Sequence, residues 1–330
     1  MIRLGSHIID DPVFLAPMSG ISDLPFRRIV QEFGAGLVFS EMIASRAVIE
    51  EVQNSKIESK KMEEDYGKEF PVAVQLAGCD PDVMAEAARI NVERGAAIID
   101  INFGCPVKKI VNKFAGSALM KDEDLAVDIM KAIVDAVDVP VTMKTRLGWD
   151  KQHLNAASLC RKAQDVGVQM VTLHGRTRCQ MYNGEADWEA VACVKEVLDI
   201  PLVVNGDILT PQDAKRAQDI AGADGVMIGR GCQGKPWMLR DTIAYLRGKD
   251  IPKPPTGEVL HALIRRHYDD ILVFYGERRG VALARKHLAW YCDGLRGAAG
   301  FRRGVNSLSD PHAVKAAIDD FFLVTESVAA

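Results

Sequence analysis

The sequence of 330 residues lacks the features that mark membrane, secreted and disulfide-bonded proteins. No stretch approaches the ~18 consecutive apolar residues of a membrane-spanning helix. Residues 1–11 contain no basic segment followed by a long apolar one, so no secretory signal is predicted and a cytoplasmic location is expected. The seven cysteines are scattered and form no C-x-x-C pair, which indicates neither a disulfide framework nor a zinc site, and no metal is expected.

Charge is almost balanced over the whole chain but unevenly distributed along it. The formal net charge is -4, which by itself gives no indication of a nucleic-acid partner. Residues 240–303, however, contain 13 Lys or Arg against 7 Asp or Glu. The sequence therefore predicts a basic C-terminal part on an acidic body.

Eight short apolar runs, rich in β-branched residues, recur along the first 230 residues. Continuous apolar runs without strict alternation are typical of parallel strands that are buried on both faces. Their predicted starts lie near residues 13, 37, 71, 98, 140, 170, 201 and 225. Amphipathic helical patterns lie between them, at 80–94, 122–137, 153–166, 187–198 and 210–220. Eight strand–helix units of this length predict a (β/α)8 barrel.

The pattern changes after residue 248. The segment KDIPKPPTG carries three prolines and cannot sustain a helix or a central strand. We expect a barrel domain at 1–248, a linker at 249–257 and a small helical domain at 258–330, with helices at 258–275, 281–295 and 311–328.

Polar residues end most of the predicted strands. In a (β/α)8 barrel these ends form the active site. Any one such residue is most simply explained as a solvent-facing strand terminus, but eight strands ending in this way together predict a functional site. The candidates are Met18, Ser19, Glu41, Gln75, Asn102, Cys105, Lys144, Arg146, His174, Arg176, Asn205, Asp207, Gly229 and Arg230.

Strands 7 and 8 end in NGDI (205–208) and GRGCQGKP (229–236), where glycines leave backbone amides free to bind a phosphate. A simple glycine turn is the alternative. The G-x-G-x-x-G at 229–234 is not read as a dinucleotide fingerprint, because no second parallel strand follows it.

Lys144 stands at the predicted barrel mouth, where an unpaired ammonium is costly. It therefore requires an anion, such as a phosphate or the N1 side of a reduced flavin. A surface ion pair is the alternative for Lys144, and a core histidine is the simpler explanation of His174 taken alone.

Cys105 lies between glycine and proline in INFGCPVKK, on the loop after strand 4. Nucleophilic use would require a neighbouring base, and no histidine is near in sequence. Proton donation requires only the neutral thiol. An inert cysteine remains the alternative.

The sequence resembles the tRNA-dihydrouridine synthases, most closely their bacterial B-type members, over nearly its whole length. The resemblance rests on the motifs APMSGISDLPFR (16–27), VQLAG (74–78), ARINVERGAAIIDINFGCPVKKIVNKFAGSALM (88–120), PVTMKTRLGW (140–149), LHGRTR (173–178), NGDI (205–208), GADGVMIGRGCQGKPW (222–237) and ARKHLAWY (284–291).

The resemblance implies reduction of the C5=C6 bond of tRNA uridines to 5,6-dihydrouridine, with FMN as cofactor and NADPH as electron donor. Hydride would pass from reduced FMN to C6, and Cys105 would give a proton to C5. The residues implied in FMN binding are Pro17, Met18, Ser19, Gln75, Lys144, His174, Asn205, Gly206, Asp207, Gly229 and Arg230. Those implied in holding the uridine are Asn102, Arg146 and Tyr182.

The resemblance also implies that tRNA is the partner and that the basic C-terminal helices bind it. Arg285 and Lys286 are expected to contact RNA there, and Lys108 and Lys109 to contact it from the loop of Cys105. A solvated helical face is the alternative for this charge, and a monomer is the expected state. Two other functions remain open: an FMN barrel acting on a free pyrimidine, and an RNA-binding protein without catalysis.

Overall fold

The computed structural model describes residues 1–53 and 71–324 of the chain. Eight parallel strands pair in a ring that is closed between β4 and β6, and this confirms the predicted barrel. Each strand begins within one residue of its predicted start. The strands are β3 (Val13–Leu15), β4 (Val38–Phe39), β6 (Val72–Ala77), β7 (Ile98–Asn102), β8 (Val141–Arg146), β9 (Met170–His174), β10 (Leu202–Asn205) and β11 (Gly225–Ile228). A short extra strand, β5 (Ile43–Ala44), pairs with the end of β6.

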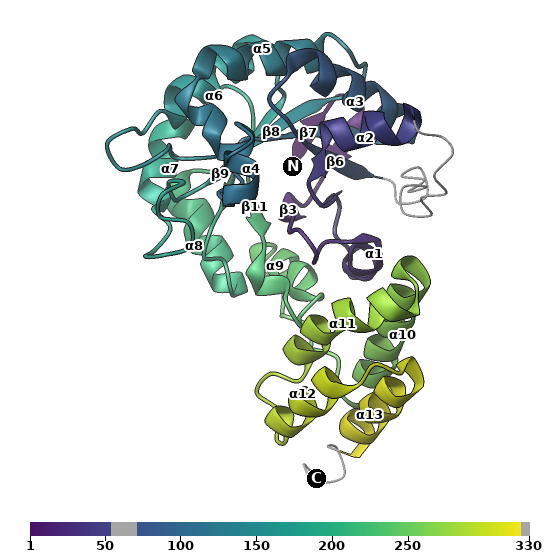
Figure 1. Ribbon diagram of the computed structural model, residues 1–330. Coiled ribbons are helices and arrows are strands. Elements are labelled where there is room, and N and C mark those ends of the chain that lie inside the picture. Colours follow the sequence, from purple (N-terminus) through teal and green to yellow (C-terminus); the bar gives the residue numbers. More distant parts are fainter. Residues whose placement is uncertain (54–70, 325–330) are drawn as a thin grey trace.

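Helices surround the barrel on its outer side (Figure 1). They are α1 (Leu24–Glu32), α2 (Ser45–Gln53), α3 (Pro81–Glu93), α5 (Glu123–Val134), α6 (Ala156–Asp165), α7 (Trp188–Lys195), α8 (Pro211–Ala221) and α9 (Met238–Leu246). Asp80, Asp122, Asp187 and Thr210 cap α3, α5, α7 and α8 by accepting a backbone N–H bond from the residue three positions later. These caps fix the helix starts that the sequence indicated.

Helix α6 begins at Ala156 rather than at the predicted residue 153. The Asp150 carboxylate accepts bonds from the backbone N–H groups of Gln152 and His153 and pairs with the His153 ring at 2.8 Å. This local turn competes with helix formation and delays the helix start.

The barrel interior is apolar at one end and polar at the other. An N-terminal hairpin that was not predicted, β1 (Ile2–Leu4) and β2 (His7–Ile9), closes the apolar end. Its side chains join the inward-facing residues of the barrel strands in one cluster, which comprises Ile2, Leu4, Ile9, Phe14, Ala16, Leu37, Phe39, Ala73, Ala97, Ile98, Met170, Val203 and Met227. With that end filled, the carboxyl ends of the strands are left to form a site.

Up to residue 324, four helices follow the barrel: α10 (Gly257–Tyr275), α11 (Glu277–Tyr291), α12 (Ala298–Ser307) and α13 (Pro311–Val324). Residues 249–256 are neither helix nor strand, and α10 begins one residue before the expected position. Helix α12 was missed because its sequence contains two glycines, and residues 325–328 of the third expected helix lie outside the described residues. Among the helices within residues 1–53 and 71–324, none combines the length and the apolar character that a membrane span requires.

The helical part packs on α1 of the barrel (Figure 1). Ile29 of α1 belongs to the apolar cluster of the C-terminal helices, and the Phe26 ring lies 5.8 Å from His267 and 5.5 Å from His287. Burial lowers the pKa of His267 to about 3, so this imidazole is neutral in the interface. This interface joins the barrel and the helical part closely. The division into two domains at residue 248 stays a prediction.

The hairpin that closes the barrel is predicted to contribute to stability through its buried side chains. Leu4 is fully buried, so Leu4→Ala should lower the free energy of unfolding by about 2–4 kcal/mol through lost burial and a residual cavity. Urea denaturation measures this. Ile8→Ala, in the same hairpin but 51% exposed, is the control and should change it by less than about 0.5 kcal/mol. Equal effects of the two variants would contradict the packing described above.

Candidate active site at the carboxyl ends of the barrel strands

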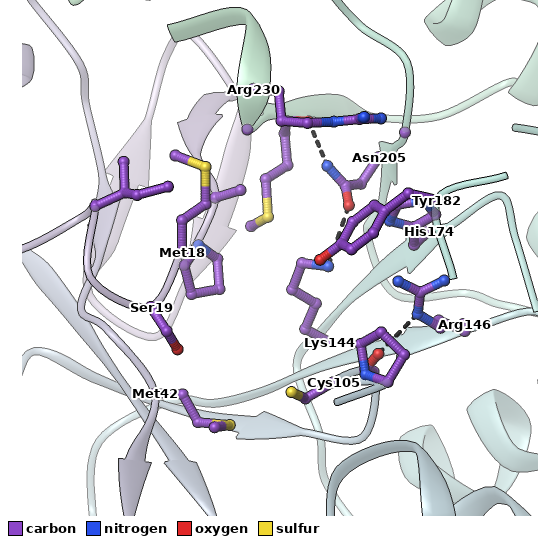
Figure 2. A pocket seen from close by; sticks show the side chains of 18 of the residues that line it. Met18, Ser19, Met42, Cys105, Lys144, Arg146, His174, Tyr182, Asn205 and Arg230 are labelled. Carbon is purple, nitrogen blue, oxygen red and sulfur yellow. Dashed lines mark hydrogen bonds between the residues drawn. The ribbon is translucent and has the colours of Figure 1, made fainter. Parts of the chain in front are cut away.

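A cavity of about 380 Å³ opens at the carboxyl ends of the strands, within the usual range of ~300–1,000 Å³ for ligand pockets. Met18, Ser19 and Met42 lie on one side of it and Arg146, His174 and Tyr182 on the other, with Lys144 between them and Cys105 below Lys144 in this view (Figure 2). The cavity brings together fifteen of the residues predicted from sequence: Pro17, Met18, Ser19, Gln75, Asn102, Cys105, Lys144, Arg146, His174, Tyr182, Asn205, Gly206, Asp207, Gly229 and Arg230.

One end of the cavity is built from the turns after β10 and β11. Asp207 has a left-handed backbone (φ 54°) and pairs with Arg176 and, at 3.2 Å, with Arg230. Burial acts to raise the pKa of Asp207, but bonds from Arg176 and the Ala186 N–H outweigh it and lower the pKa. Gly206 has φ 118°, and a Cβ there would lie 2.8 Å from the Cβ of Ala186. Only glycine fits this turn. The half-exposed Arg230, from the turn after β11, reaches it through its pair with Asp207.

Lys144 occupies the middle of the cavity. Its Nζ donates to Asn205 Oδ1 at 3.1 Å, and Asn205 Nδ2 donates to the Met227 carbonyl at 2.8 Å (Figure 2). Burial lowers the pKa of Lys144 to about 8, the positive charge of Arg146 acts in the same direction, and the negative charge of Asp100 opposes both. Lys144 therefore loses its proton at a lower pH than an ordinary lysine does.

His174 lies beside Lys144 at the end of β9. Burial lowers the pKa of His174 well below its usual value, and the charges of Arg146, Lys144 and Arg176 add to this effect. The ring is neutral, and its Nε2 lies 3.3 Å from Arg176 Nη1, which can donate to it. A neutral ring can hydrogen-bond to a ligand without adding charge.

A chain of side-chain amides leads from the barrel interior to Cys105. Gln75 Nε2 donates to Asp100 Oδ2 at 2.6 Å, and Asn102 Nδ2 donates to Gln75 Oε1 at 2.7 Å. Asn102 Oδ1 in turn accepts the backbone N–H of Cys105 at 2.9 Å and that of Gly104 at 3.2 Å. These bonds fix which atom of each amide donates and hold the loop of Cys105 against the strands.

Sequence reasoning did not identify Asp100. Its carboxylate lies beneath the cavity, inside β7, and does not line it. A signal was present, because residues two apart in a strand share a face and Asp100 precedes Asn102 by two positions.

Arg146 joins the Cys105 loop to the Tyr182 loop. Its Nε donates to the Gly104 carbonyl at 2.7 Å, and its Nη1 donates to the carbonyls of Thr177 and Met181 at 3.0 and 2.9 Å. Only 3% of its surface is exposed. Arg146 was expected to hold the uridine, and the structure shows that much of its guanidinium binds the protein's own backbone.

The four residues expected to contact RNA lie outside the cavity. Lys108 and Lys109 are exposed on the short helix α4 (Lys108–Val111), directly after the cavity residue Val107. Arg285 is half-buried and donates to the Leu308 carbonyl at 2.8 Å. Its guanidinium therefore helps to hold the C-terminal helices together.

Lys286 faces the barrel rather than the open surface. A Cβ on Gly20 would lie 3.0 Å from its Nζ, and Gly20 donates its N–H to Glu41. Burial lowers the pKa of Lys286, while the carboxylates of Asp23 and Glu41 oppose the shift. The structure thus places Lys286 between the helical part and the loop that carries Met18 and Ser19.

Within residues 1–53 and 71–324, no three His, Cys, Asp or Glu side chains lie together in a way that could hold a metal ion.

Comparison with known proteins identifies the family. The model of the family described as dihydrouridine synthase matches residues 14–326. A probable tRNA-dihydrouridine synthase of Rickettsia bellii is 51% identical over 98% of each chain. The tRNA-dihydrouridine synthase B of Pseudomonas aeruginosa is 44% identical over 98% of this chain and 96% of its own. The chain belongs to the dihydrouridine synthase family. The resemblance found in the sequence, including that to the B-type members, is confirmed.

Solved structures outside this enzyme family share the barrel. An old yellow enzyme homologue of Zymomonas mobilis aligns with a TM-score of 0.53 at 14% identity, covering 76% of this chain and 93% of that one. A morphinone reductase variant in complex with tetrahydroNAD aligns with a TM-score of 0.54 at 14% identity, covering 77% and 91%. At this identity the likeness concerns the fold alone.

The three carbonyl contacts of Arg146 predict that a lysine cannot replace it. Arg146→Lys removes the planar guanidinium that donates to both the Cys105 loop and the Tyr182 loop. It should lower the free energy of unfolding by about 2–3 kcal/mol. Hydrogen exchange should also become faster in residues 177–183. Arg161→Lys is the control, because exposed Arg161 donates to a single carbonyl, that of Val197. The account of Arg146 fails if both variants are equally stable and the 177–183 amides remain protected.

Proposed function

We propose that this member of the family reduces the C5=C6 bond of particular tRNA uridines, with FMN as cofactor and NADPH as electron donor. One observation carries the proposal: Cys105 and Lys144 face the same cavity, and the turns after β10 and β11 form one end of it with Gly206, Asp207 and Arg230. A thiol proton donor, a cation and a phosphate site are what such a reduction requires of the protein.

The side chains fit FMN chemically. Gln75 uses one amide hydrogen and one lone pair within the protein, so it keeps one donor and one acceptor for the N3–H and O4 edge of a flavin. Lys144 makes one side-chain bond, to Asn205, and keeps donors for the N1 and O2 side. Gly229, Arg230 and the turn at 205–207 would hold the phosphate, and Pro17, Met18 and Ser19 would contact the ring.

Bound FMN would supply the hydride for C6 of the uracil, with NADPH as the source of the electrons. Cys105 donates a proton to C5, which completes the addition of two hydrogens across the double bond. The thiolate that remains is stabilised by Lys144 and Arg146, because each of these cations interacts with a negative charge on Cys105. Asn102 keeps the thiol loop in place through the Cys105 N–H.

We propose that the RNA lies across the barrel mouth and the helical part. A uridine within folded tRNA must leave its stack to reach the cavity. Exposed cations suited to phosphate contacts are Lys108, Lys109, Arg278, Arg279, Arg296 and Arg303. Because Arg285 and Lys286 make internal contacts, we expect their effect on RNA binding to include a structural part.

Cys105→Ala should lower dihydrouridine formation by about 10²–10⁴-fold, since the proton donor is lost, while FMN remains bound. Mass spectrometry of tRNA nucleosides measures the product, and the flavin absorbance measures the bound cofactor. Cys179→Ala is the matched control, because Cys179 is an exposed thiol outside the cavity. Undiminished activity of Cys105→Ala would exclude the proton-donor role. Product formed from free uridine as readily as from tRNA would favour an enzyme of free pyrimidines.

Arg278→Gln with Arg303→Gln should weaken tRNA binding and reduce the slope of log K against log salt by about one for each phosphate that is no longer neutralised. Filter binding at several salt concentrations gives the slope. The control is Lys131→Gln, on α5 of the barrel's outer ring, whose ammonium pairs with Asp135. An identical slope for the arginine variant and the control would show that this helical face does not contact RNA.

A further inference from the structure

Asp100 is a fully buried carboxylate beneath the cavity. Its two oxygens each accept one hydrogen bond of 2.6 Å, from Gln75 Nε2 and from Thr142 Oγ1. Both partners donate, so both favour the ionised carboxylate over the protonated acid. Asp100 is therefore held as an anion in a place that water does not reach.

The strand register places this anion close to Lys144. Asp100 is the partner of Thr142 across β7 and β8, and Asn102 is the partner of Lys144 two residues further along. Residues two apart on a strand share a face, so Asp100, Thr142 and Lys144 all point into the barrel. Lys144 and Asp100 thus lie diagonally opposite each other, within reach of a long side chain.

The other groups around Lys144 do not supply a permanent negative charge. Arg146 is positive and His174 is neutral. Cys105 is negative only as the thiolate, and Asn205 contributes a neutral oxygen. Among the described residues whose charge acts on Lys144, Asp100 is thus the one that is negative at neutral pH without first losing a proton to a substrate.

We propose that Asp100 is a positioning residue whose buried carboxylate keeps Lys144 cationic, so that the cavity presents an ammonium to its ligand. Burial raises the pKa of Asp100 to about 6, which still leaves it ionised at neutral pH. Without it, burial and Arg146 would lower the pKa of Lys144 further below about 8. The role toward a flavin rests on the proposed function, whereas the effect on the charge of Lys144 does not.

Competitive acetylation of the flavin-free protein with acetic anhydride tests the proposal directly. The extent of labelling of each lysine across pH, read by mass spectrometry, gives the pKa of Lys144 without any cofactor. Asp100→Asn keeps the shape and removes the charge, so we expect the labelling midpoint of Lys144 to fall by about one pH unit or more. At a given alkaline pH this is about a tenfold loss of the charged form. Asp100→Ser makes the same change of charge and serves if the first variant does not fold.

Asp23→Asn is the matched control. Burial also raises the pKa of Asp23 to about 6, but its charged neighbours include Glu41 and Arg27, and it acts on Lys286. Asp23→Asn should therefore lower the midpoint of Lys286 and leave that of Lys144 in place, while Asp100→Asn should do the reverse. A general loosening of the fold would shift both lysines in both variants.

FMN affinity, measured by flavin fluorescence over pH 6.5–9.5, supplies the second readout. The loss of affinity at alkaline pH should begin about one unit lower in Asp100→Asn than in the wild type. An unmoved Lys144 midpoint in Asp100→Asn would overturn the inference, whether or not FMN binds. Failure of the wild-type protein to bind FMN, with the Lys144 midpoint shifted as expected, would overturn the proposed cofactor and leave the role of Asp100 standing.

Discussion

A positive charge inside a closed barrel is the constraint on which the site depends. An ammonium removed from water must be matched by nearby negative or polar groups, or it loses its proton. Lys144 is matched by the Asn205 amide oxygen and by the buried Asp100 carboxylate. Asp100 in turn requires donors, which Gln75 and Thr142 supply. In the polar layer of the barrel, Asn205, Asp100, Gln75 and Thr142 are thus linked to Lys144 by hydrogen bonds and charge.

The connections extend from that layer to the loops that line the cavity. Asn102 donates to Gln75 in the barrel interior and accepts the backbone N–H of Cys105, so it links the interior to the Cys105 loop. Arg146 donates to the carbonyl of Gly104, next to Cys105, and to that of Met181, and so joins this loop to the loop of Tyr182. Cys105 lies on a loop, but its backbone is held by Asn102 of β7 and by Ser117, and Arg146 of β8 holds the preceding Gly104. A site built in this way is pre-organised before any ligand binds.

Much of this architecture could be predicted from sequence, because it depends on local patterns. Buried parallel strands leave continuous apolar runs, and the polar residues that end these runs identified most of the cavity residues. Asp100 escaped prediction because it lies within a run, where its acceptor role depends on Gln75, 25 positions earlier, and Thr142, 42 positions later. Likewise, the sequence marks Arg285 and Lys286 as charged but does not show that Leu308 and the Gly20 loop occupy their head groups. The hairpin at residues 2–9 was missed because strands of three residues carry too little pattern.

The most direct test of the account is the absorbance spectrum of the purified protein, recorded before and after addition of NADPH and then of unmodified tRNA. We expect flavin bands near ~450 nm that NADPH bleaches and that tRNA restores, with dihydrouridine appearing in the RNA. That sequence of changes would identify the cofactor, the electron donor and the acceptor in one experiment. A colourless protein that cannot be loaded with FMN, or a reduced flavin that tRNA does not reoxidise, would contradict the account.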